Sequence, residues 1–277
     1  MRRHSAAPRA TRAWKAPVNW PLWIGLTLLG LILLLAWVGP TIAPHDPVKP
    51  IYIVQDPGTA AFVRPPFRPG QVPGFPLGAD PLGRDTLSQI LWALRPTLVL
   101  VLVAAALRLL LGLITGIAAG WGTGRSARLL EGVTTLAVAI PVLLAALCLV
   151  AAFGPQWGVW AFILGLCLTG WAETARVIHD QTSLVKTQPY VEAAQALGAP
   201  GLGVVGRHVL PHVLPAVWIL LPLEVSTALV VTAGLGFLGY FVNAIWGPLG
   251  DWTAVRTAGQ PELGQMLANG AVIAQQH

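Results

Sequence analysis

Long apolar runs dominate the hydropathy pattern of this chain. Five of them carry almost no charge, at positions 20–39, 96–121, 133–154, 157–171 and 213–241. A helix of roughly 20 apolar residues crosses the ~30 Å hydrocarbon core of a bilayer. The fourth run is short, and we expect its helix to continue past Glu173 into water. The pattern predicts an all-α integral membrane protein with about five membrane helices.

The composition supports this class and excludes soluble ones. Hydrophobic residues make up 55% of the chain and charged residues only 10%, whereas soluble domains carry about 25% charged residues. The net charge of +6 comes from Lys and Arg scattered between the apolar runs. These residues form no single basic face, so the charge does not indicate nucleic-acid binding.

The distribution of Lys and Arg predicts the orientation, because cytoplasmic loops carry the excess of these residues. With the N-terminus inside, ten of them lie inside and six outside. The ten are Arg2, Arg3, Arg9, Arg12, Lys15, Arg125, Arg128, Arg176, Lys186 and Arg207. We therefore expect a multi-pass protein of the cytoplasmic membrane with a cytoplasmic N-terminus. The first run is longer than a signal-peptide core and has no convincing cleavage site, so we expect it to be retained.

The apolar runs divide the chain into segments. We expect a cytoplasmic basic arm at residues 1–19 and a first membrane helix at 20–40. An extracytoplasmic segment follows at 41–89, where many Pro and Gly residues oppose one regular element. A core domain at 90–241 and an extracytoplasmic tail at 242–277 complete the division.

Gly112, Gly116 and Gly120 recur at every fourth position of the second run. Small residues at this spacing let another helix backbone approach closely in lipid. Glycine is also common in membrane helices generally, and it is the spacing that favours packing. We expect this face to contact another membrane helix.

Two charges, Arg108 and Glu224, interrupt the second and fifth runs. Each costs about 2.5–3.5 kcal/mol at a helix centre, and charges at that depth usually serve a function. Both are therefore candidate residues of a translocation path. The alternative is that each faces a protein groove or reaches the membrane surface. An ion pair between them requires adjacent helices, which the sequence leaves open.

The chain has no motif for a metal, a cofactor or a nucleotide. Cys148 and Cys167 lie in apolar runs without ligand spacing. His208 and His212 are four apart, but Pro211 separates them and no carboxylate completes a site. A P-loop needs GxxxxGK[ST], and none of the lysines follows such a pattern. We expect this chain to bind no cofactor.

Residues 190–211, YVEAAQALGAPGLGVVGRHVLP, lie between two membrane helices on the basic side, yet they are neither charged nor of disordered composition. The alanines favour a helix, and Gly198 with Pro200 ends it. We expect a short helix, a glycine turn and a second short segment leading into Pro211. Such a stiff knob with small side chains suits a partner protein.

This segment resembles the EAA loop of permease subunits in binding-protein-dependent ABC importers. The match consists of residues 192–194 (EAA), Gly198 and residues 207–211 (RHVLP), an ending similar to the dipeptide/oligopeptide/nickel branch. Residues 77–88, LGADPLGRDTLS, resemble the LGTDxLGRDxLS stretch of the second, C-type permease subunit of that branch. Residues 43–47, APHDP, resemble the sequence after its first helix.

The resemblance implies a type I ABC-importer transmembrane fold that works by alternating access. The EAA loop, at about residues 189–211, is then a coupling helix seated in a groove of an ATPase. Implied partners are a second permease subunit, two ATPase subunits that use ATP and Mg, and an extracytoplasmic solute-binding protein. The implied solute is a peptide, with nickel or another small solute as alternatives. The coupling residues are Tyr190, Glu192, Ala193, Ala194, Leu197 and Gly198.

The end of this sequence departs from the family pattern. The family has another membrane helix after a segment like residues 261–270, whereas this sequence stops at His277, so we expect the final helix to be missing. A non-transporting or regulatory permease remnant is therefore an alternative function. A membrane-embedded hydrolase is less favoured, because Glu224 is the only carboxylate deep in an apolar run.

Asp80, Arg84 and Asp85 form a charged cluster in the sequence. It is either a contact site for a binding protein or solute, or a local turn held by an ion pair.

Overall fold

The computed structural model describes residues 19–55, 62–242, 262–264, 266, 267 and 270. The basic arm and most of the predicted tail lie outside these residues. The helices in the described part are α1 (Trp20–Ile42), α2 (Thr86–Trp121), α3 (Arg125–Ala139), α4 (Val142–Phe153), α5 (Val159–Lys186), α6 (Pro189–Ala196), α7 (Gly201–Val204) and α8 (Leu210–Phe237). A 3₁₀ turn, η1 (Pro155–Trp157), precedes α5, and one π-helical turn, η2 (Val205–Val209), precedes α8.

Four helical stretches of the described chain are long and apolar enough to cross a membrane, and the α3–α4 pair makes five if it is one broken span. This agrees with the predicted helical membrane protein of about five spans. The fourth helix, α5, continues to Lys186, well beyond its apolar run, as expected. Its second half packs against α2 over much of its length.

The centre of the helical body is the parallel pair α2 and α5. A Cβ atom added at Gly112 would lie 2.5 Å from Cγ2 of Thr174, and one at Gly116 would lie 2.6 Å from the carbonyl oxygen of Ala175. At Gly120 the same atom would lie 2.8 Å from the carbonyl oxygen of His179. The three glycines therefore all face α5, and their missing side chains set how closely the two backbones approach.

The start of α2 differs from the prediction. This helix begins at Thr86, within the segment predicted to be extracytoplasmic, whereas its apolar run begins at Pro96. The carboxylate of Asp85 accepts hydrogen bonds from the backbone N–H groups of Leu87 and Ser88, which caps the helix. Polar residues fill the first turns, so a count of apolar residues misses them.

The third apolar run is two helices rather than one. Helices α3 and α4 meet at a bend of 95°. Pro141 lies at the bend, and a proline disfavours helical geometry at the residue before it. Ile140 accordingly has an extended backbone, with φ of −90° and ψ of 125°.

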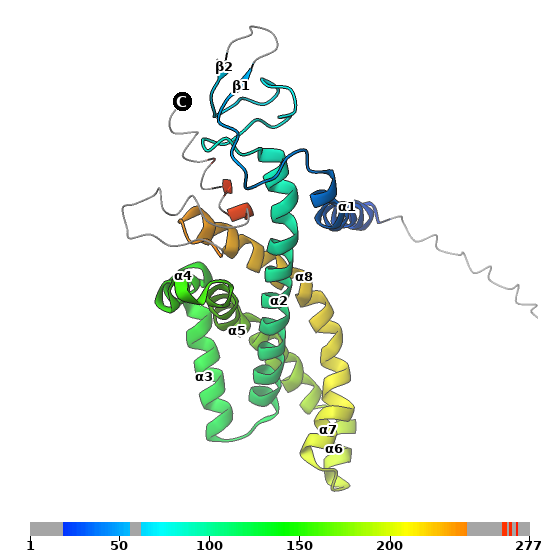
Figure 1. Ribbon diagram of the computed structural model, residues 1–277. Coiled ribbons are helices and arrows are strands. Elements are labelled where there is room, and N and C mark those ends of the chain that lie inside the picture. The colour runs from blue at the N-terminus through cyan, green and yellow to red at the C-terminus, as the bar shows by residue number, and fades with distance from the viewer. Residues whose placement is uncertain (1–18, 56–61, 243–261, 265, 268–269, 271–277) are drawn as a thin grey trace, which may run out of the picture.

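The segment between α1 and α2 forms a small lobe at one end of α2 (Figure 1). This lobe, residues 41–85, has its own core of Phe67, Val72, Phe75 and Ala79. Strands β1 (Val54–Gln55) and β2 (Phe62–Val63) pair antiparallel in it. The C-terminal end of α1 contacts the first turns of α2, where Gly39 lies against Leu91.

Helices α6 and α7 lie at the opposite end of α2 from the lobe (Figure 1). We call residues 189–204, which contain both helices, the knob. The predicted short helix, glycine turn and second short segment are all present here. The fold thus separates a proline- and glycine-rich lobe from a helical knob by the full length of α2.

Candidate functional site

The local structure of the knob follows from its sequence. Pro189 occupies the first turn of α6, where its missing N–H has no partner to lose. The helix ends in a Schellman motif, because Gly198 N–H donates to the Gln195 carbonyl and Ala199 N–H to the Ala194 carbonyl. Gly198 has φ of +83°, the left-handed conformation that glycine adopts most easily. The turn between α6 and α7 is therefore fixed by the backbone.

One buried side chain anchors the knob to the helical body. Val191 is fully buried and packs with Ile178 and Val185 of α5, with Val209 at the end of η2 and with Val213 in the first turn of α8. Burying a valine in this way contributes about 1.5–3 kcal/mol. The knob is therefore attached to both long helices that enter it.

Lys186 makes a second attachment. Its ammonium Nζ donates to the carbonyl oxygens of Trp121 at 2.9 Å and Gly122 at 3.3 Å. It also lies over the Trp121 ring, 5.8 Å from the centroid. These contacts satisfy carbonyls at the C-terminal end of α2, where a positive charge is favoured. The last residue of α5 thus ties the end of α2 to the start of the knob.

Aromatic contacts connect α6 to the beginning of α8. The ring of Tyr190 stacks on His212 with centroids 5.7 Å apart, and its hydroxyl lies 3.4 Å from Nε2 of His212. Nδ1 of His212 is 2.7 Å from the His208 carbonyl oxygen. The ring of Tyr190 also lies against His208, with centroids 5.8 Å apart. These contacts hold α6 against the start of α8.

The outer surface of the knob is apolar at its tip. Leu197 is 88% exposed and Leu202 is 87% exposed, one on each side of the Gly198 turn. Glu192, Ala193 and Ala196 of α6 are also exposed. The sequence analysis singled out Leu197 but missed Leu202. No local sequence pattern indicates the exposure of Leu202, because it depends on how α7 turns away from the core.

The charges Arg108 and Glu224 lie together in the helical body. Nη1 of Arg108 is 3.5 Å from Oε2 of Glu224, which joins α2 to α8. The guanidinium also donates to the Leu166 carbonyl at 2.6 Å and to the Thr169 hydroxyl at 3.3 Å, both on α5. The hydroxyl of Thr174 donates to Oε1 of Glu224 at 2.6 Å.

This network is closed to the surroundings. Arg108 is fully buried and Glu224 is 6% exposed. A Cβ atom at Gly170 would overlap the guanidinium, so a glycine is needed to seat it. Buried charges are tolerated when they are paired and hydrogen-bonded, as here. The suggested solute-path role of the two residues stays a prediction, and the contacts account for them as a link between three helices.

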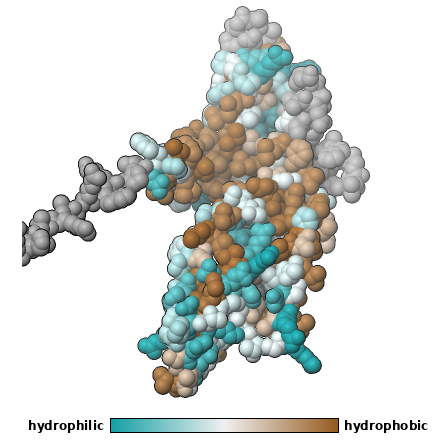
Figure 2. All heavy atoms as spheres, turned by 180° about the vertical axis from the view of Figure 1, so that it is seen from behind, coloured by the Kyte–Doolittle hydropathy of each residue, from teal (hydrophilic) through white to brown (hydrophobic). Residues whose placement is uncertain are grey.

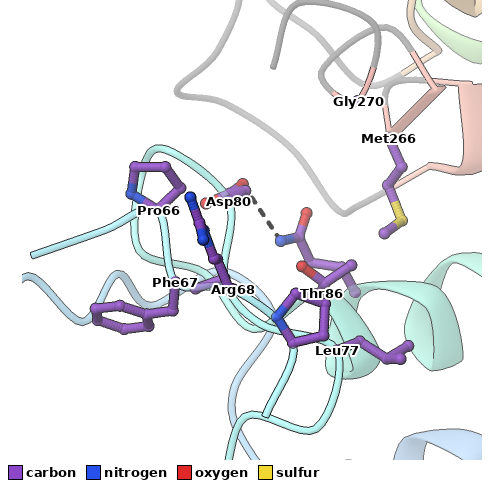
Figure 3. A pocket seen from close by; sticks show the side chains of 11 residues that line it. Pro66, Phe67, Arg68, Leu77, Asp80, Thr86, Met266 and Gly270 are labelled. Carbon is purple, nitrogen blue, oxygen red and sulfur yellow. Dashed lines mark hydrogen bonds between the residues drawn. The ribbon is translucent and has the colours of Figure 1, made fainter. Parts of the chain in front are cut away.

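The Asp80, Arg84, Asp85 cluster is a turn in the lobe. The Arg84 guanidinium contacts Asp80 Oδ2 through Nη2 at 2.7 Å and through Nε at 2.8 Å. Asp85 caps α2, and its Oδ2 is 3.5 Å from Nδ1 of His45. Beside the turn lies a cavity of about 530 Å³, across which Met266 and Gly270 face Pro66, Arg68 and Thr86 (Figure 3).

The fold and site define a class of protein, a multi-span helical membrane protein with a rigid helical knob at one end. Residues 110–274, more than half of the chain, match the family described as binding-protein-dependent transport system inner membrane component. The chain belongs to this family. It is therefore a transport component rather than an enzyme, as predicted.

Individual relatives extend the match toward the N-terminus. The chain is 29% identical over 240 residues to the oligopeptide transport system permease protein OppC of Bacillus subtilis (strain 168), covering 87% of this chain and 73% of that protein. It is 28% identical over 239 residues to the dipeptide transport system permease protein DppC of the same organism, covering 86% and 69%. The di/tripeptide transport system permease protein DppC of Pseudomonas aeruginosa (strain UCBPP-PA14) is 28% identical over 228 residues, covering 82% and 72%.

Proposed function

We propose that this protein is the membrane-spanning permease subunit of an ATP-driven importer of peptides. The solute class is supported by its relatives, which are permeases of oligopeptide, dipeptide and di/tripeptide transport systems. The N-terminus and the knob lie on the cytoplasmic side, and the lobe lies outside. The excess of Lys and Arg on the knob side supports this orientation.

The knob is the surface that receives the force of ATP hydrolysis. The single observation that carries this assignment is the pair of exposed leucines, Leu197 and Leu202, on a short segment that is fixed by Val191 and Lys186. A rigid apolar projection in water favours insertion into a groove of a partner. Glu192, Ala193 and Ala194 complete the contact helix, and Tyr190 holds it against α8.

The complete importer contains this chain, a second permease subunit, two ATPases and an extracytoplasmic solute-binding protein. The ATPases bind ATP and Mg, and this chain supplies no cofactor site. Closure of the ATPases draws the two knobs together, and because α5 and α8 enter the knob directly, its displacement moves both long helices. This motion switches the paired permeases between outward-facing and inward-facing states.

Co-purification tests the coupling assignment. The tagged chain is purified gently from membranes of its native host, and the associated ATPases are quantified by mass spectrometry. We expect Leu197→Asp with Leu202→Asp to lose the ATPases while retaining the second permease, because an uncompensated charge in an apolar groove is costly. Ile53→Asp, at an exposed apolar position of the lobe, is the matched control and should retain them.

Two further variants test the geometry of the knob. Gly198→Pro cannot adopt the observed φ of +83° and should also release the ATPases. Glu192→Lys should lower the recovery of the ATPases more than Gln195→Lys, which places a lysine on the same helix. Full ATPase recovery with every knob variant would refute the coupling assignment.

A further inference from the structure

A polar groove lies between α3 and α5 on the knob side of the helical body. It encloses about 270 Å³, and its polar lining residues are Glu131, Thr134 and Thr135 of α3 with Arg176, His179 and Asp180 of α5. Glu173 precedes Arg176 by three residues, and Asp180 follows it by four. Residues at these intervals share one helix face. We call Glu173, Arg176 and Asp180 the α5 charged stripe.

The packing of α2 against α5 gives the depth of this stripe. Gly112 contacts Trp171 and Thr174, the residues that flank Glu173 closely. Along α2, Gly112 is about 14 Å from Trp121 at one end of the apolar run and about 24 Å from Pro96 at the other, at 1.5 Å per residue. Glu173 therefore lies within the ~30 Å hydrocarbon layer rather than at its edge.

At this depth Glu173 is exposed. Arg176 and Asp180, about 5 and 10 Å nearer the knob along α5, are exposed as well, and within the described part of the chain Arg176 makes no ion pair. The Asp180 carboxylate lies 3.1 Å from Nδ1 of the neighbouring His179. Charged side chains are not tolerated against lipid, and they face a water-filled cavity or a partner instead. Hydrophilic surface does interrupt the apolar surface in the half of the helical body away from the lobe (Figure 2).

We infer that the α3–α5 groove is a wall of the aqueous solute path. Arg176 in the groove binds the carboxylate of a short peptide, and Glu173, which lies beside the groove on the same face of α5, binds its ammonium. This inference rests on the proposed transport function. The two charges have opposite sign and lie three residues apart on one face, about 5–6 Å between Cβ atoms. The Thr134 and Thr135 hydroxyls donate to the Leu130 and Glu131 carbonyls, which leaves their oxygens to accept from peptide N–H groups.

Labelling of cysteines placed in the stripe tests whether water reaches the proposed wall, and it needs no solute. Single cysteines are placed at Glu173 and Arg176 in a Cys148→Ala, Cys167→Ala background of the whole transporter. Inverted membrane vesicles are then treated with a charged, membrane-impermeant thiosulfonate. Ile114→Cys is the control, because Ile114 is 57% exposed on α2 at nearly the same depth. We expect labelling about tenfold faster at the two stripe positions than at Ile114.

The labelling result decides the inference independently of the proposed function. Labelling at Glu173→Cys no faster than at Ile114→Cys would overturn the aqueous wall, even if the transporter assembles and imports peptides. Fast labelling at both stripe positions supports it, even if the imported solute proves not to be a peptide.

Uptake tests the contacts with the solute. Alanyl-alanine and its C-terminal amide are compared as probes in transporter reconstituted with its partners. Arg176→Gln should lower uptake of the free dipeptide by about tenfold, and lower uptake of the amide much less, because only the former offers a carboxylate. Glu173→Gln should lower uptake of both. Arg125→Gln, which removes an exposed arginine of α3 outside the groove, is the control. Unchanged uptake in both stripe variants would overturn the contact assignment.

Discussion

Two sets of charged side chains lie within about one helical turn of each other in depth, in opposite surroundings. Arg108 and Glu224 are buried, paired with each other and hydrogen-bonded to α5. Glu173 and Arg176 face outward from α5. Arg108 and Glu224 interrupt apolar runs and Glu173 and Arg176 follow the end of one, yet both sets lie in helices long enough to cross a membrane.

The difference shows how depth and direction together define the role of an intramembrane charge. A closed network such as that of Arg108 holds helices at a fixed spacing, because each nitrogen of its guanidinium already has an acceptor. An exposed charge at the same depth has unsatisfied bonding capacity, which only water, a partner or a solute can satisfy. Variants of the buried set should therefore change stability, and variants of the exposed set should change transport.

The largest effect is expected for Arg108→Leu. This change leaves Glu224 buried without its cationic partner, which costs about 3–5 kcal/mol. The double variant Arg108→Leu, Glu224→Leu should recover part of that loss, because no unpaired charge remains. Thermal unfolding of the purified complex in detergent measures both. The free energy of unfolding of Glu173→Gln should lie within about 0.5 kcal/mol of that of the unmodified protein. A larger loss at Glu173 than at Arg108 would reverse the comparison.

A smaller loss is expected for Gly116→Val. The added side chain must enter space occupied by the Ala175 carbonyl and by Ile178, so α2 and α5 have to separate. Such overpacking costs about 1–3 kcal/mol and would also displace the Arg108 network. Gly30→Val is the matched control, since no atom outside α1 lies within 4 Å of that site. The same unfolding assay applies, and equal stability of the two variants would contradict the packing argument.

Asp85→Ala tests a buried charge outside the membrane. Its carboxylate caps α2 and accepts from the hydroxyl of Ser88, and it is almost fully buried. Loss of the cap costs about 0.5–2 kcal/mol. Limited proteolysis of the lobe in right-side-out vesicles should accelerate, and Asp85→Asn should have a milder effect because asparagine also caps. Identical cleavage rates for the two variants would argue against a capping role.

The smallest effect is expected at Asp46 of the lobe. The backbone N–H of Val48 is the main group that lowers the pKa of this exposed carboxyl below 3.8, with the charge of Lys49 helping. A lowered folded-state pKa adds stability that is present above the unfolded value and is lost as the pH falls through the folded value. Asp46→Asn should therefore speed lobe proteolysis slightly at pH 7, and the difference from the unmodified protein should disappear in strong acid, where Asp46 is protonated. A difference that is absent at pH 7 and appears only in acid would refute this assignment.

Much of the architecture was predictable from local sequence. The apolar runs indicated the membrane helices, and the alanines with Gly198 indicated the short helix and the turn of the knob, because these features depend on composition and backbone preference over a few residues. The start of α2 and the bend at Pro141 were missed, although Asp85 and Pro141 are themselves local signals. They were overlooked because the count followed apolar residues only.

The candidate sites divide in the same way. The EAA resemblance located the knob, but the exposure of Leu202 depends on how α7 turns away from the core, and no local pattern shows that. The glycine spacing indicated a packing face without naming α5 as its partner. Pairing of segments distant in sequence is decided by how several helices fit together at once.

The sequence by itself determined that this chain spans a membrane, where its helices lie and which segment forms the short helix and turn of the knob, since burial of apolar residues in lipid and backbone preference act locally. Only the tertiary structure decided which intramembrane charges are satisfied and which are free. Arg108 meets Glu224 because α2, α5 and α8 converge, and Glu173 faces outward because the Gly112 face of α2 occupies the other side of α5. The role of a charge in a membrane follows from what lies against it, and that is a property of the packed helices.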